Sequence, residues 1–550
     1  MPGFEPTTRT RNLGRLAAEA FDLLVVGGGI TGAGVAREAA LRGLTVGLVE
    51  ARDFASGTSS RSSKLIHGGL RYLEQGEIAL VREAATERKV LRRIAPHLTD
   101  TALMLVPVYG RTSAGVYKLR VGLSLFDKLA AVDAGERHRI LSRTDALAAE
   151  PRLNADRLQG AAVYPEYVTD DARLVLDTLK AAHHAGAVVV NHAQVVGLGG
   201  RGAERRLEVR DAFSDATFTA RARVVVNAAG PWVDAVRRLD VEAPGPVLHL
   251  TKGIHLVFRA EDLPVRHCVV MRARDRRPLF TVPRGPYVYV GTTDTSYEGA
   301  LEEPAVTAED AEYLFDTLAR SFSDLHLTSG HVVGAWAGLR PLVHEEGRSP
   351  SEISRKDEIA VSPSSLITIA GGKLTTYRRM AERVVEAALP LLHRTAPAGR
   401  SESEPLAGGN LAADSVTAGL VPAEIRARLR AVHGSDAGEV CALAEDLASW
   451  EPLAADVPLS AAEVRHAVRR EMACTLADVL ERRSRLALFA TERACAVAPK
   501  VAALVGAELG WSAERRDAEV AAFARQCEAR LGWRGVTSPV ACVAALGTRA

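Results

Sequence analysis

The sequence predicts an α/β fold built on a parallel sheet, followed by a helical C-terminal region. Two observations lead to this prediction. A short apolar strand at 23–26 runs into a glycine turn at 27–32, GGGITG, and an Ala-rich helix and a second strand ending on Glu50 follow. Beyond residue 419 the pattern is helical and includes a capping box of Ser460 and Glu463. A unit of strand, glycine turn, helix and strand is the fingerprint of a Rossmann-like dinucleotide-binding domain.

The glycines of this turn have different physical roles. Gly27 permits the tight turn, Gly29 lets the backbone approach a pyrophosphate, and Gly32 lets the helix pack close to the strand. The start of the helix then faces the diphosphate with free N–H groups and the positive end of its dipole. Glu50 ends the second strand, where its carboxylate can accept hydrogen bonds from an adenosine ribose and would repel a 2′-phosphate. The alternative is an ordinary glycine turn in a parallel sheet.

Length and composition narrow the class of protein. A chain of 550 residues is too long for one core and predicts two or three domains. The net charge of +2 argues against a nucleic-acid partner, which needs a concentrated basic surface. The six cysteines are scattered without metal-ligand spacing, so we predict reduced thiols, no metal site and a cytoplasmic protein. We find no secretory signal and no apolar run of about 18 residues, which leaves attachment to a membrane surface open.

Polar and glycine-rich segments recur further along the chain. Residues 56–69 combine Ser, Thr, Lys and Gly, which suits an extended polar ligand; the alternative is a flexible polar loop. The strand at 221–227 ends on Asn-Ala-Ala-Gly, and Pro231 opens a helix, as if a second strand of the same sheet touched the same ligand. Gly371 and Gly372 precede another helix start that favours anions. Thr307 is the expected N-cap of a helix.

The segment 116–130, VYKLRVGLSLFDKLA, mixes apolar residues with Lys118, Arg120 and Lys128. It fits a basic amphipathic surface for lipid. It fits equally well a domain helix whose cations extend past its apolar face to water.

Several motifs together resemble one enzyme family. They are TSSRSSKLIHGGLRYLE (58–74), VVNAAGPWVD (225–234), GTTDTSY (291–297), GLRPL (338–342) and GGKLTTYR (371–378). In this order they are similar to the FAD-dependent glycerol-3-phosphate dehydrogenases of respiration, flavoproteins of the D-amino-acid oxidase type. The resemblance runs from about residue 20 to 395, and REMACTLADVLERRSR (470–485) extends it into the C-terminal region.

The resemblance implies an α/β FAD-binding domain of the glutathione-reductase/D-amino-acid-oxidase type, an inserted antiparallel-sheet substrate domain and an all-α C-terminal domain. The expected limits are an N-terminal tail at 1–18, the FAD-binding domain at about 19–95, 160–240 and 335–395, the substrate domain at about 96–159 and 241–334, a linker at 396–418, and the helical domain at 419–550.

The implied reaction is oxidation of sn-glycerol 3-phosphate to dihydroxyacetone phosphate, with hydride passing to FAD. The dianionic phosphate needs fixed cations, and the resemblance implies Arg71, Arg340 and Lys373. Tyr72 and Thr376 are further candidates for contact with the substrate. The hydroxyl proton needs a base, and a histidine, His255, is the best candidate because imidazole titrates near neutrality; the alternative is a structural histidine on a strand.

For FAD the resemblance implies a wider set of residues. The three glycines of the first turn take the pyrophosphate and Glu50 the ribose, while the remaining candidates are Thr58, Ser59, Ser62, Lys64, His67, Gly230, Gly372 and Thr375. Asp294 is expected to organise the strands instead of reacting. No His or Cys stands out as a covalent tether to the flavin.

The electron acceptor is the least visible partner. The resemblance implies a membrane quinone and peripheral attachment to the inner face of the plasma membrane, with segment 116–130 or a C-terminal helix as the contact. An oxidase that passes electrons to oxygen and releases hydrogen peroxide is the first alternative. A flavin-bearing RNA-modifying or RNA-binding protein is the second, and the near-neutral charge speaks against it. A homodimer is expected from the family alone.

Overall fold

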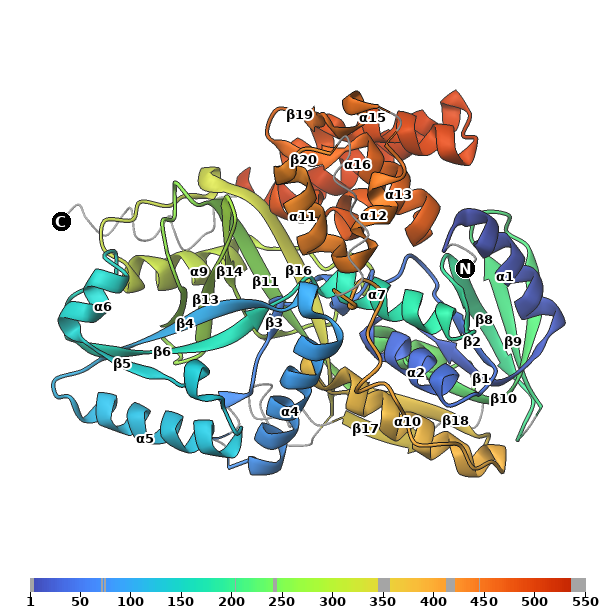
Figure 1. Cartoon of the computed structure of the whole chain (residues 1–550), viewed down its shortest axis with the longest axis horizontal. Coiled ribbons are helices and arrows are strands. Elements are labelled where there is room, and N and C mark those ends of the chain that lie inside the picture. Colours follow the sequence, from blue (N-terminus) through green and yellow to red (C-terminus); the bar gives the residue numbers. More distant parts are fainter. Residues whose placement is uncertain are drawn as a thin grey trace.

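The computed structural model describes residues 4–70, 73, 76–202, 204–240, 245–344, 357–411, 421–444 and 446–535. Two large sheets lie side by side, and the C-terminal helices gather above the region where the sheets meet (Figure 1). This architecture confirms the predicted fold class. Arg71 and Tyr72 lie outside the described residues.

The first sheet is the dinucleotide-binding sheet. Its strands follow the order β17-β18-β10-β1-β2-β7, and all neighbours in this path are parallel except β17 and β18. The strands are β1 (Ala20–Val26), β2 (Val46–Val49), β7 (Val188–Val190), β10 (Thr217–Asn227), β17 (Asp357–Val361) and β18 (Leu366–Gly371). An antiparallel extension adds β8 (Ala193–Gly199) and β9 (Arg205–Asp211) beside β10.

Both faces of this sheet are covered. Leu23 and Val25 point into one core, and Leu24 and Val26 point into the other, as the alternation of a strand requires. The first core lies under α2 (Ile30–Leu41), α7 (Asp171–His184) and α10 (Tyr377–Leu392). The second lies under α1 (Pro6–Ala18) and the β8–β9 extension. Two buried faces explain why these strands are continuously apolar in sequence.

Residues 1–18 were expected to be a polar tail, and the structure differs. Residues 6–18 form α1, because a few side chains suffice to hold the helix against the sheet. Leu16 is fully buried. The Asn12 side-chain N–H group donates to the Val189 carbonyl, and Arg9 donates to the Asn191 carbonyl, so these buried donors are hydrogen bonded.

The second sheet is largely antiparallel. Its main path is β15-β11-β14-β13-β12-β4-β6-β3, with β16 beside β11 and β5 beside β6. The strands are β3 (Leu65–Ile66), β4 (Asp100–Tyr109), β5 (Arg139–Ser142), β6 (Leu158–Val168), β11 (Leu248–Arg259), β12 (Cys268–Arg272), β13 (Pro278–Arg284), β14 (Tyr287–Gly291), β15 (Thr295–Ser296) and β16 (Val332–Val343). Strand β16 brings this sheet against β18 of the first one.

Four longer helices accompany the second sheet: α4 (Ile78–Ile94), α5 (Ala114–Leu129), α6 (Arg143–Ala149) and α9 (Ala308–Ser321). Helix α9 begins at Thr307, which forms a capping box with Asp310 and confirms the predicted N-cap. Helix α5 lies at the edge of the molecule, on the opposite side from the C-terminal helices (Figure 1).

The C-terminal region is mainly helical, with one small hairpin. Its elements are α11 (Ala423–His433), α12 (Ala437–Cys441), β19 (Pro452–Ala454), β20 (Val457–Ser460), α13 (Ala461–Glu471), α14 (Leu486–Phe489), α15 (Thr491–Leu509) and α16 (Ala513–Leu531). Ser460 and Glu463 form the predicted capping box at the start of α13. The preceding segment 399–411, expected to be part of a linker, packs on the first domain: the Leu406 amide donates to the Ile94 carbonyl.

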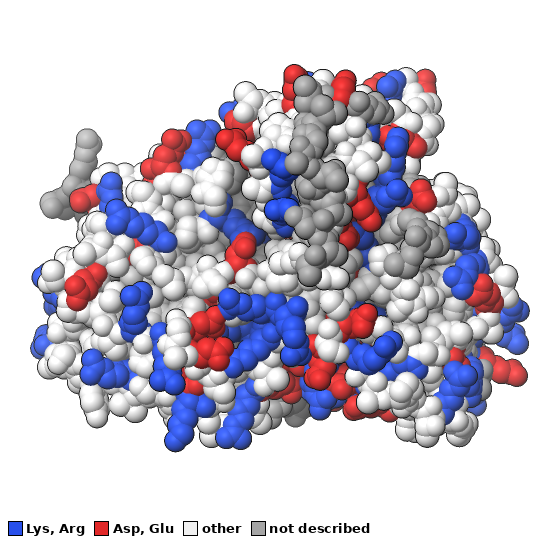
Figure 2. Space-filling model, viewed as in Figure 1, with Lys and Arg blue, Asp and Glu red and all other residues white. Residues whose placement is uncertain are grey.

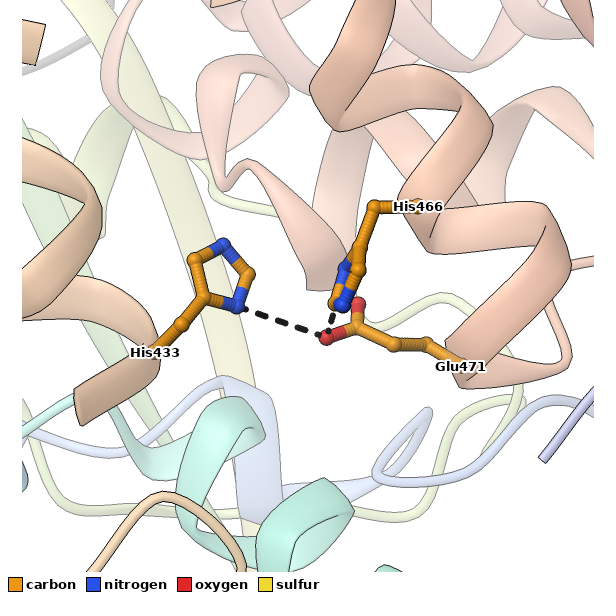
Figure 3. A group of neighbouring side chains, drawn as sticks. All are labelled: His433, His466 and Glu471. Carbon is orange, nitrogen blue, oxygen red and sulfur yellow. Dashed lines mark ion pairs between the residues drawn. The ribbon is translucent and has the colours of Figure 1, made fainter. Parts of the chain in front are cut away.

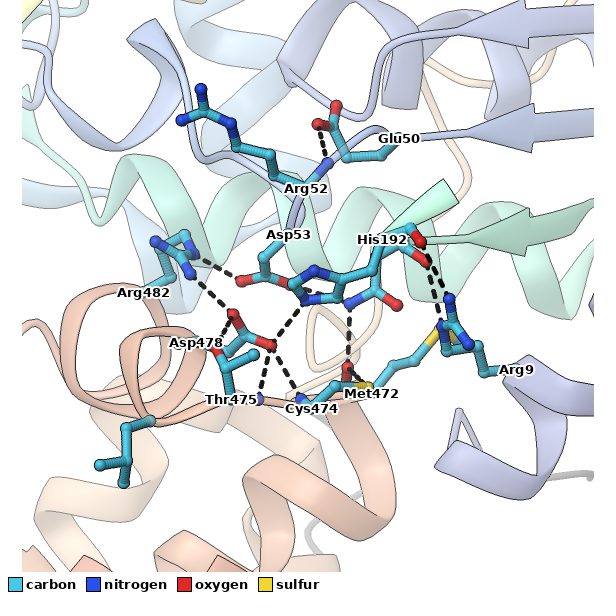
Figure 4. A network of polar contacts seen from close by, with 12 residues as sticks. Arg9, Glu50, Arg52, Asp53, His192, Met472, Cys474, Thr475, Asp478 and Arg482 are labelled. Carbon is cyan, nitrogen blue, oxygen red and sulfur yellow. Dashed lines mark hydrogen bonds and ion pairs between the residues drawn. The ribbon is translucent and has the colours of Figure 1, made fainter. Parts of the chain in front are cut away.

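Buried charges join this region to the first domain. Arg482 and Arg483, in a π-helical turn at 478–483, both contact the Asp53 carboxylate, and Arg482 also contacts Asp478. Asp478 in turn accepts a hydrogen bond from His192 (Figure 4). We call Asp53, His192, Asp478, Arg482 and Arg483 the domain-junction cluster.

Candidate functional site

A cavity of about 740 Å³ lies at the carboxyl ends of β1, β10 and β18. These strands are neighbours in the first sheet, so the three glycine-bearing strand ends meet at one edge. Gly27, Gly230 and Gly371 each contribute to the cavity lining. The predicted strand ends therefore border a single shared cavity. Open α/β sheets usually bind their ligands at this position, outside the carboxyl ends of the strands.

The first glycine turn cannot accept side chains. Gly27 has a φ of +112°, and a Cβ there would lie 2.6 Å from the Ala228 oxygen. A Cβ on Gly32 would lie 1.9 Å from the Gly27 oxygen, so this glycine lets α2 start directly against β1. The bare backbone and the helix start form a cradle that fits the pyrophosphate of a dinucleotide.

The Ser/Thr-rich segment after β2 runs between the cavity and the second sheet. The Thr58 hydroxyl donates to the Leu339 carbonyl, and Trp336 Nε1 donates to the Ser62 carbonyl, so this segment is fixed along β16. Ser59 Oγ accepts a hydrogen bond from the Ile30 amide at the start of α2. These hydroxyl groups fix the loop as well as lining the cavity, which an unanchored polar loop would not do.

His255 lies on β11, beside this loop, and is 2% exposed. Its Nε2 is 2.9 Å from Ser63 Oγ, and its ring stacks on Trp336 at a centroid distance of 4.8 Å. Burial, and then the charges of Arg340 and Lys64, hold the pKa of His255 well below its usual value. The imidazole is therefore neutral at physiological pH and can accept a proton.

Glycine makes room for this histidine. A Cβ on Gly291, the residue paired with His255 across the strands, would lie 2.1 Å from the imidazole ring. Within the described part of the chain, His255 Nδ1 is buried and has no hydrogen-bond partner. A buried ring nitrogen of this kind is costly unless it acts on a ligand or a water molecule.

Arg340 projects from β16 beside the same site. Its guanidinium is 3.0 Å from Asp294 Oδ1 and donates to Thr292 Oγ1 at 2.9 Å. A Cβ on Gly253 would lie 2.2 Å from the guanidinium, so this glycine provides the space for it. Asp294 thus positions the Arg340 guanidinium, whereas the expectation was that it organises the strands.

Of the two remaining substrate candidates, Lys373 lines the cavity and Thr376 lies outside its lining. Lys373 follows β18, lines the cavity, and directly precedes the short 3₁₀ turn Leu374–Thr376 that leads into α10. Thr376 is buried, and its hydroxyl oxygen is 3.5 Å from the Lys373 carbonyl oxygen. The roles predicted for both residues stay predictions.

Comparison with known proteins shows which protein families the chain resembles. Residues 22–377 match the family model of FAD dependent oxidoreductases, and residues 399–516 match the C-terminal domain of alpha-glycerophosphate oxidase. The aerobic glycerol-3-phosphate dehydrogenase of Bacillus subtilis is 40% identical over 500 residues, which cover 88% of this chain and 90% of that protein. The Staphylococcus haemolyticus enzyme of the same name is 38% identical over 488 residues, 85% of this chain and 87% of the relative.

The chain belongs to the FAD dependent oxidoreductases, in the family of the aerobic glycerol-3-phosphate dehydrogenases. A solved structure agrees: the glycerol-3-phosphate dehydrogenase from Bacillus halodurans complexed with FAD has a TM-score of 0.81 and 33% identity, covering 97% of this chain and all of that one. The protein is thus an FAD-dependent oxidoreductase, and the glycine cradle fits its cofactor.

The residues predicted to hold FAD fall into two groups. Those that line the cavity are Gly27, Gly29, Glu50, Thr58, Ser59, Ser62, Gly230 and Gly372. Those outside its lining are Gly32, Lys64, His67 and Thr375. Gly32 acts through packing, as predicted. Lys64 is buried in an ion pair with Asp171 at 2.6 Å, so the structure gives its ammonium group a partner within the protein.

Glu50 is oriented by the backbone of this oxidoreductase. Its carboxylate accepts hydrogen bonds from the Gly28 amide at 2.6 Å and from the Arg52 amide at 2.9 Å. Burial raises the pKa of the Glu50 carboxyl, and the two backbone N–H groups oppose that effect. The side chain lies at the cavity wall with its oxygens already fixed, where a ribose can approach.

Sequence reasoning missed part of the lining. Arg52, Gln194, Trp232, Glu302 and Pro341 also border the cavity. Trp232 and Pro341 lie inside the quoted motifs, so their place was visible in the sequence although they had been given no role. Trp232 Nε1 donates to Glu302, which lies in a loop far along the chain, and no local signal marks that partner.

Among the residues that the structure describes, two clusters have donor atoms close enough together for a metal ion. One is His433, His466 and Glu471 (Figure 3). Its carboxylate is already paired with Arg173. The other is Asp53, His192 and Asp478, where Arg482 contacts both carboxylates. Because guanidinium groups neutralise these acids, we assign both clusters to the docking of the C-terminal region.

Proposed function

We propose that this protein oxidises the secondary alcohol of sn-glycerol 3-phosphate to dihydroxyacetone phosphate. The names of the relatives support this substrate. The observation in the chain itself that carries the proposal is His255, a buried neutral imidazole held by Ser63 and adjacent to Arg340. When bound, FAD supplies the acceptor for the hydride from C2.

The proposed roles of the cations follow from the charge of the substrate. Arg340, held by Asp294 and Thr292, presents a guanidinium whose orientation is fixed before the substrate binds. Lys373 adds a second positive charge, and Arg71 and Thr376 complete the phosphate site. Binding of the remote phosphate would orient the C2 hydroxyl toward His255 and reduce the entropic cost of reaching the transition state.

His255 would remove the hydroxyl proton as C2 loses its hydride. Its lowered pKa keeps the ring unprotonated over the neutral range, and its contacts with Ser63 and Trp336 hold it in one orientation. The product is a ketone, and the proton leaves on the imidazole. The ring needs no large movement at any step, which suits a general base on a strand.

Anaerobic titration of the purified holoprotein tests the substrate. Adding sn-glycerol 3-phosphate should bleach the oxidised flavin absorbance stoichiometrically, whereas the enantiomeric phosphate and glycerol should bleach it far more slowly. A flavin that remains oxidised in excess sn-glycerol 3-phosphate would refute the proposed reaction.

For the acceptor we propose a membrane quinone, reached from the inner face of the plasma membrane. Helix α5 supports this. Tyr117, Val121 and Leu125 form one stripe on it and are 70%, 51% and 46% exposed. Lys118, Arg120 and Lys128 on the same helix are also exposed. Basic side chains project along this edge in Figure 2, and an apolar stripe flanked by cations suits an anionic lipid surface.

Within the described residues, no helix is both long enough and apolar enough to span a bilayer. The attachment we propose is therefore peripheral. Co-sedimentation with vesicles of mixed neutral and anionic lipid should be lost in a variant with Ser at positions 117, 121 and 125. The buried Leu123 is unchanged in that variant, so its melting temperature should match the wild type. Equal co-sedimentation of both proteins would refute α5 as the contact.

Oxygen is the alternative acceptor, and one observation favours it: residues 399–516 match a domain described from alpha-glycerophosphate oxidase. Turnover with oxygen alone would release hydrogen peroxide at the rate of substrate oxidation. We expect instead that a soluble quinone analogue raises turnover well above the rate in air. A homodimer is also proposed, and light scattering of the purified protein tests it.

A further inference from the structure

A second cavity, of about 330 Å³, lies where three parts of the chain meet. The segment after β2 contributes Arg52, Ser56 and Arg61, and β16 contributes Trp336. The C-terminal region contributes residues of the π-helical turn and of α16, including Gln526. Arg52 and Ser56 also line the larger cavity, so the two cavities are neighbours. Glu303 lines the smaller cavity and is exposed, which places part of its rim at the protein surface.

Four arginines and four acidic side chains line this cavity, and one arginine differs from the others. Arg482 contacts Asp53, Asp478 and Glu481, Arg530 contacts Glu481, and Arg52 lies 3.5 Å from Glu302. The Arg61 guanidinium makes no hydrogen bond and no ion pair with any residue that the structure describes; its backbone N–H alone is bonded, to the Thr58 carbonyl. Each nearby buried acid is already shared among other guanidinium groups.

Two further groups in the lining lack a partner among the described residues. Gln526 Oε1 is buried without a hydrogen bond. The Ser56 hydroxyl, on a residue 9% exposed, makes none either, although its backbone N–H donates to the Asp53 carbonyl. Arg61 is only partly exposed, and burial lowers the pKa of its guanidinium. An unpaired, partly desolvated guanidinium is costly unless an anion meets it.

We propose that this cavity is a binding site for a small oxyanion, a phosphate or carboxylate that carries hydroxyl groups, with Arg61 as its principal ligand. The anionic group accepts hydrogen bonds from Arg61, the Ser56 hydroxyl contacts the same group, and a ligand hydroxyl donates to Gln526. The volume suits a compound of a few carbon atoms and is too small for a dinucleotide. Bound there, the anion ties the C-terminal region to the segment that also borders the FAD cavity.

Calorimetric titration of the FAD-loaded protein tests this proposal, with inorganic phosphate as one probe and malonate as the other. Phosphate is also expected at Arg340, so four proteins are compared: wild type, Arg61→Gln, Arg340→Gln and the double variant. We expect two phosphate sites in the wild type. Arg61→Gln should weaken one of them by roughly tenfold to a hundredfold, and Arg340→Gln should weaken the other. The double variant should bind almost no phosphate.

Malonate shows which oxyanion the cavity prefers. Binding of malonate that depends on Arg61 would assign the site to carboxylates, and binding of phosphate alone would assign it to phosphates. Arg61→Lys should retain part of the affinity, because the charge remains while the bidentate geometry is lost. Should Arg61→Gln fail to fold, Gln526→Met tests the same cavity without altering a charge, with an expected loss of a few fold for phosphate, whose P–OH group can donate to Gln526.

One result would overturn the proposal. If Arg61→Gln and Gln526→Met bind both probes as the wild type does, while Arg340→Gln loses all phosphate binding, the smaller cavity holds only water. The proposed reaction fails on a different readout, the flavin absorbance, so failure of one proposal is distinguishable from failure of the other.

Discussion

The domain-junction cluster and the candidate active site both bury Arg, His and Asp side chains, yet they balance charge differently. In the cluster every carboxylate has a cationic partner: Asp53 has Arg482 and Arg483, and Asp478 has Arg482 and His192. These partners outweigh burial, so the pKa of Asp478 lies well below its usual value and that of Arg482 is raised. Each carboxylate of the cluster is thus paired with at least one guanidinium group.

The candidate active site retains unused hydrogen-bonding capacity. His255 is neutral, with its pKa lowered, and its Nδ1 has no partner among the described residues. The comparison teaches that buried charge by itself does not identify a functional site. Groups whose charges are paired with each other hold domains together, whereas a neutral buried group with hydrogen-bonding capacity left over is available to a substrate.

The largest effect expected from this comparison is on catalysis. Replacing His255 by Gln should lower the rate of flavin reduction by roughly 10²- to 10⁴-fold, the usual contribution of a general base, with little change in melting temperature. Anaerobic rapid mixing with sn-glycerol 3-phosphate measures it. His249→Gln, on the same strand, is the matched control and should reduce the flavin at nearly the wild-type rate. Equal rates of flavin reduction in the two variants would show that His255 is not the general base.

A substitution in the domain-junction cluster should instead lower the stability of the fold. Asp53→Asn leaves the buried Arg483 without a carboxylate partner and removes one of the three acids that Arg482 contacts, which typically costs about 3–5 kcal/mol in the free energy of unfolding. Denaturant unfolding measures this loss. The exposed pair Arg15–Glu19 is the control, because Glu19→Gln should cost less than about 0.5 kcal/mol. Similar losses in both variants would show that the cluster does not hold the domains.

The pH dependence of stability provides a third test, at the cluster of His433, His466 and Glu471. The pKa of His466 is lowered to about 4, mainly by burial, and burial also lowers that of His433. The unfolded chain then binds more protons than the folded chain below pH 6.5, so stability must fall as the pH drops from 6.5 toward 4.5. His466 alone accounts for a loss on the order of 2–3 kcal/mol.

Unfolding measured across this pH range, with His466→Gln for comparison, decides the point. The variant should have a flatter profile between pH 6.5 and 4.5. Below about pH 4.5 Glu471 adds its own loss, because its pKa is held low by Arg173 and the neighbouring histidines. An identical slope in both proteins would exclude His466 as the source.

The smallest expected effect comes from a change in the orientation of the Arg340 guanidinium. Asp294→Asn keeps a hydrogen-bonding group beside Arg340 but removes the charge that fixes it. We expect the KM for sn-glycerol 3-phosphate to rise by about three- to tenfold with kcat less affected, a loss of roughly 1 kcal/mol. Steady-state kinetics with a quinone analogue measure it. A fall in kcat with an unchanged KM would indicate that Asp294 acts in the chemical step.

Local patterns predicted much of the fold. The turn at Gly27 and the caps at Thr307 and Ser460 depend on residues a few positions apart, and each was visible in the sequence. The helix α1 was missed because its contacts are long range. Arg9 bonds to residues almost 200 positions away, at the end of β7, and its own segment reads as polar.

The candidate site divides in the same way. The cavity glycines belong to contiguous motifs, the resemblance pointed to Arg340, and the need for a base near neutrality pointed to His255. The partners that set their chemistry were not predictable: Ser63 and Trp336 reach His255 from segments 192 and 81 residues away, which pairing between strands alone brings together. Gly253 and Gly291 were not singled out either, since the space they provide exists only in the folded sheet.

The central claim is that Arg340 holds the substrate phosphate so that the secondary alcohol at C2 can react beside His255. The most direct measurement compares rates of anaerobic flavin reduction by sn-glycerol 3-phosphate and by glycerol in the wild type and in Arg340→Gln. The account predicts a strong wild-type preference for the phosphate ester that falls by about ten- to hundredfold in the variant, with glycerol affected little. An unchanged preference in Arg340→Gln would contradict it.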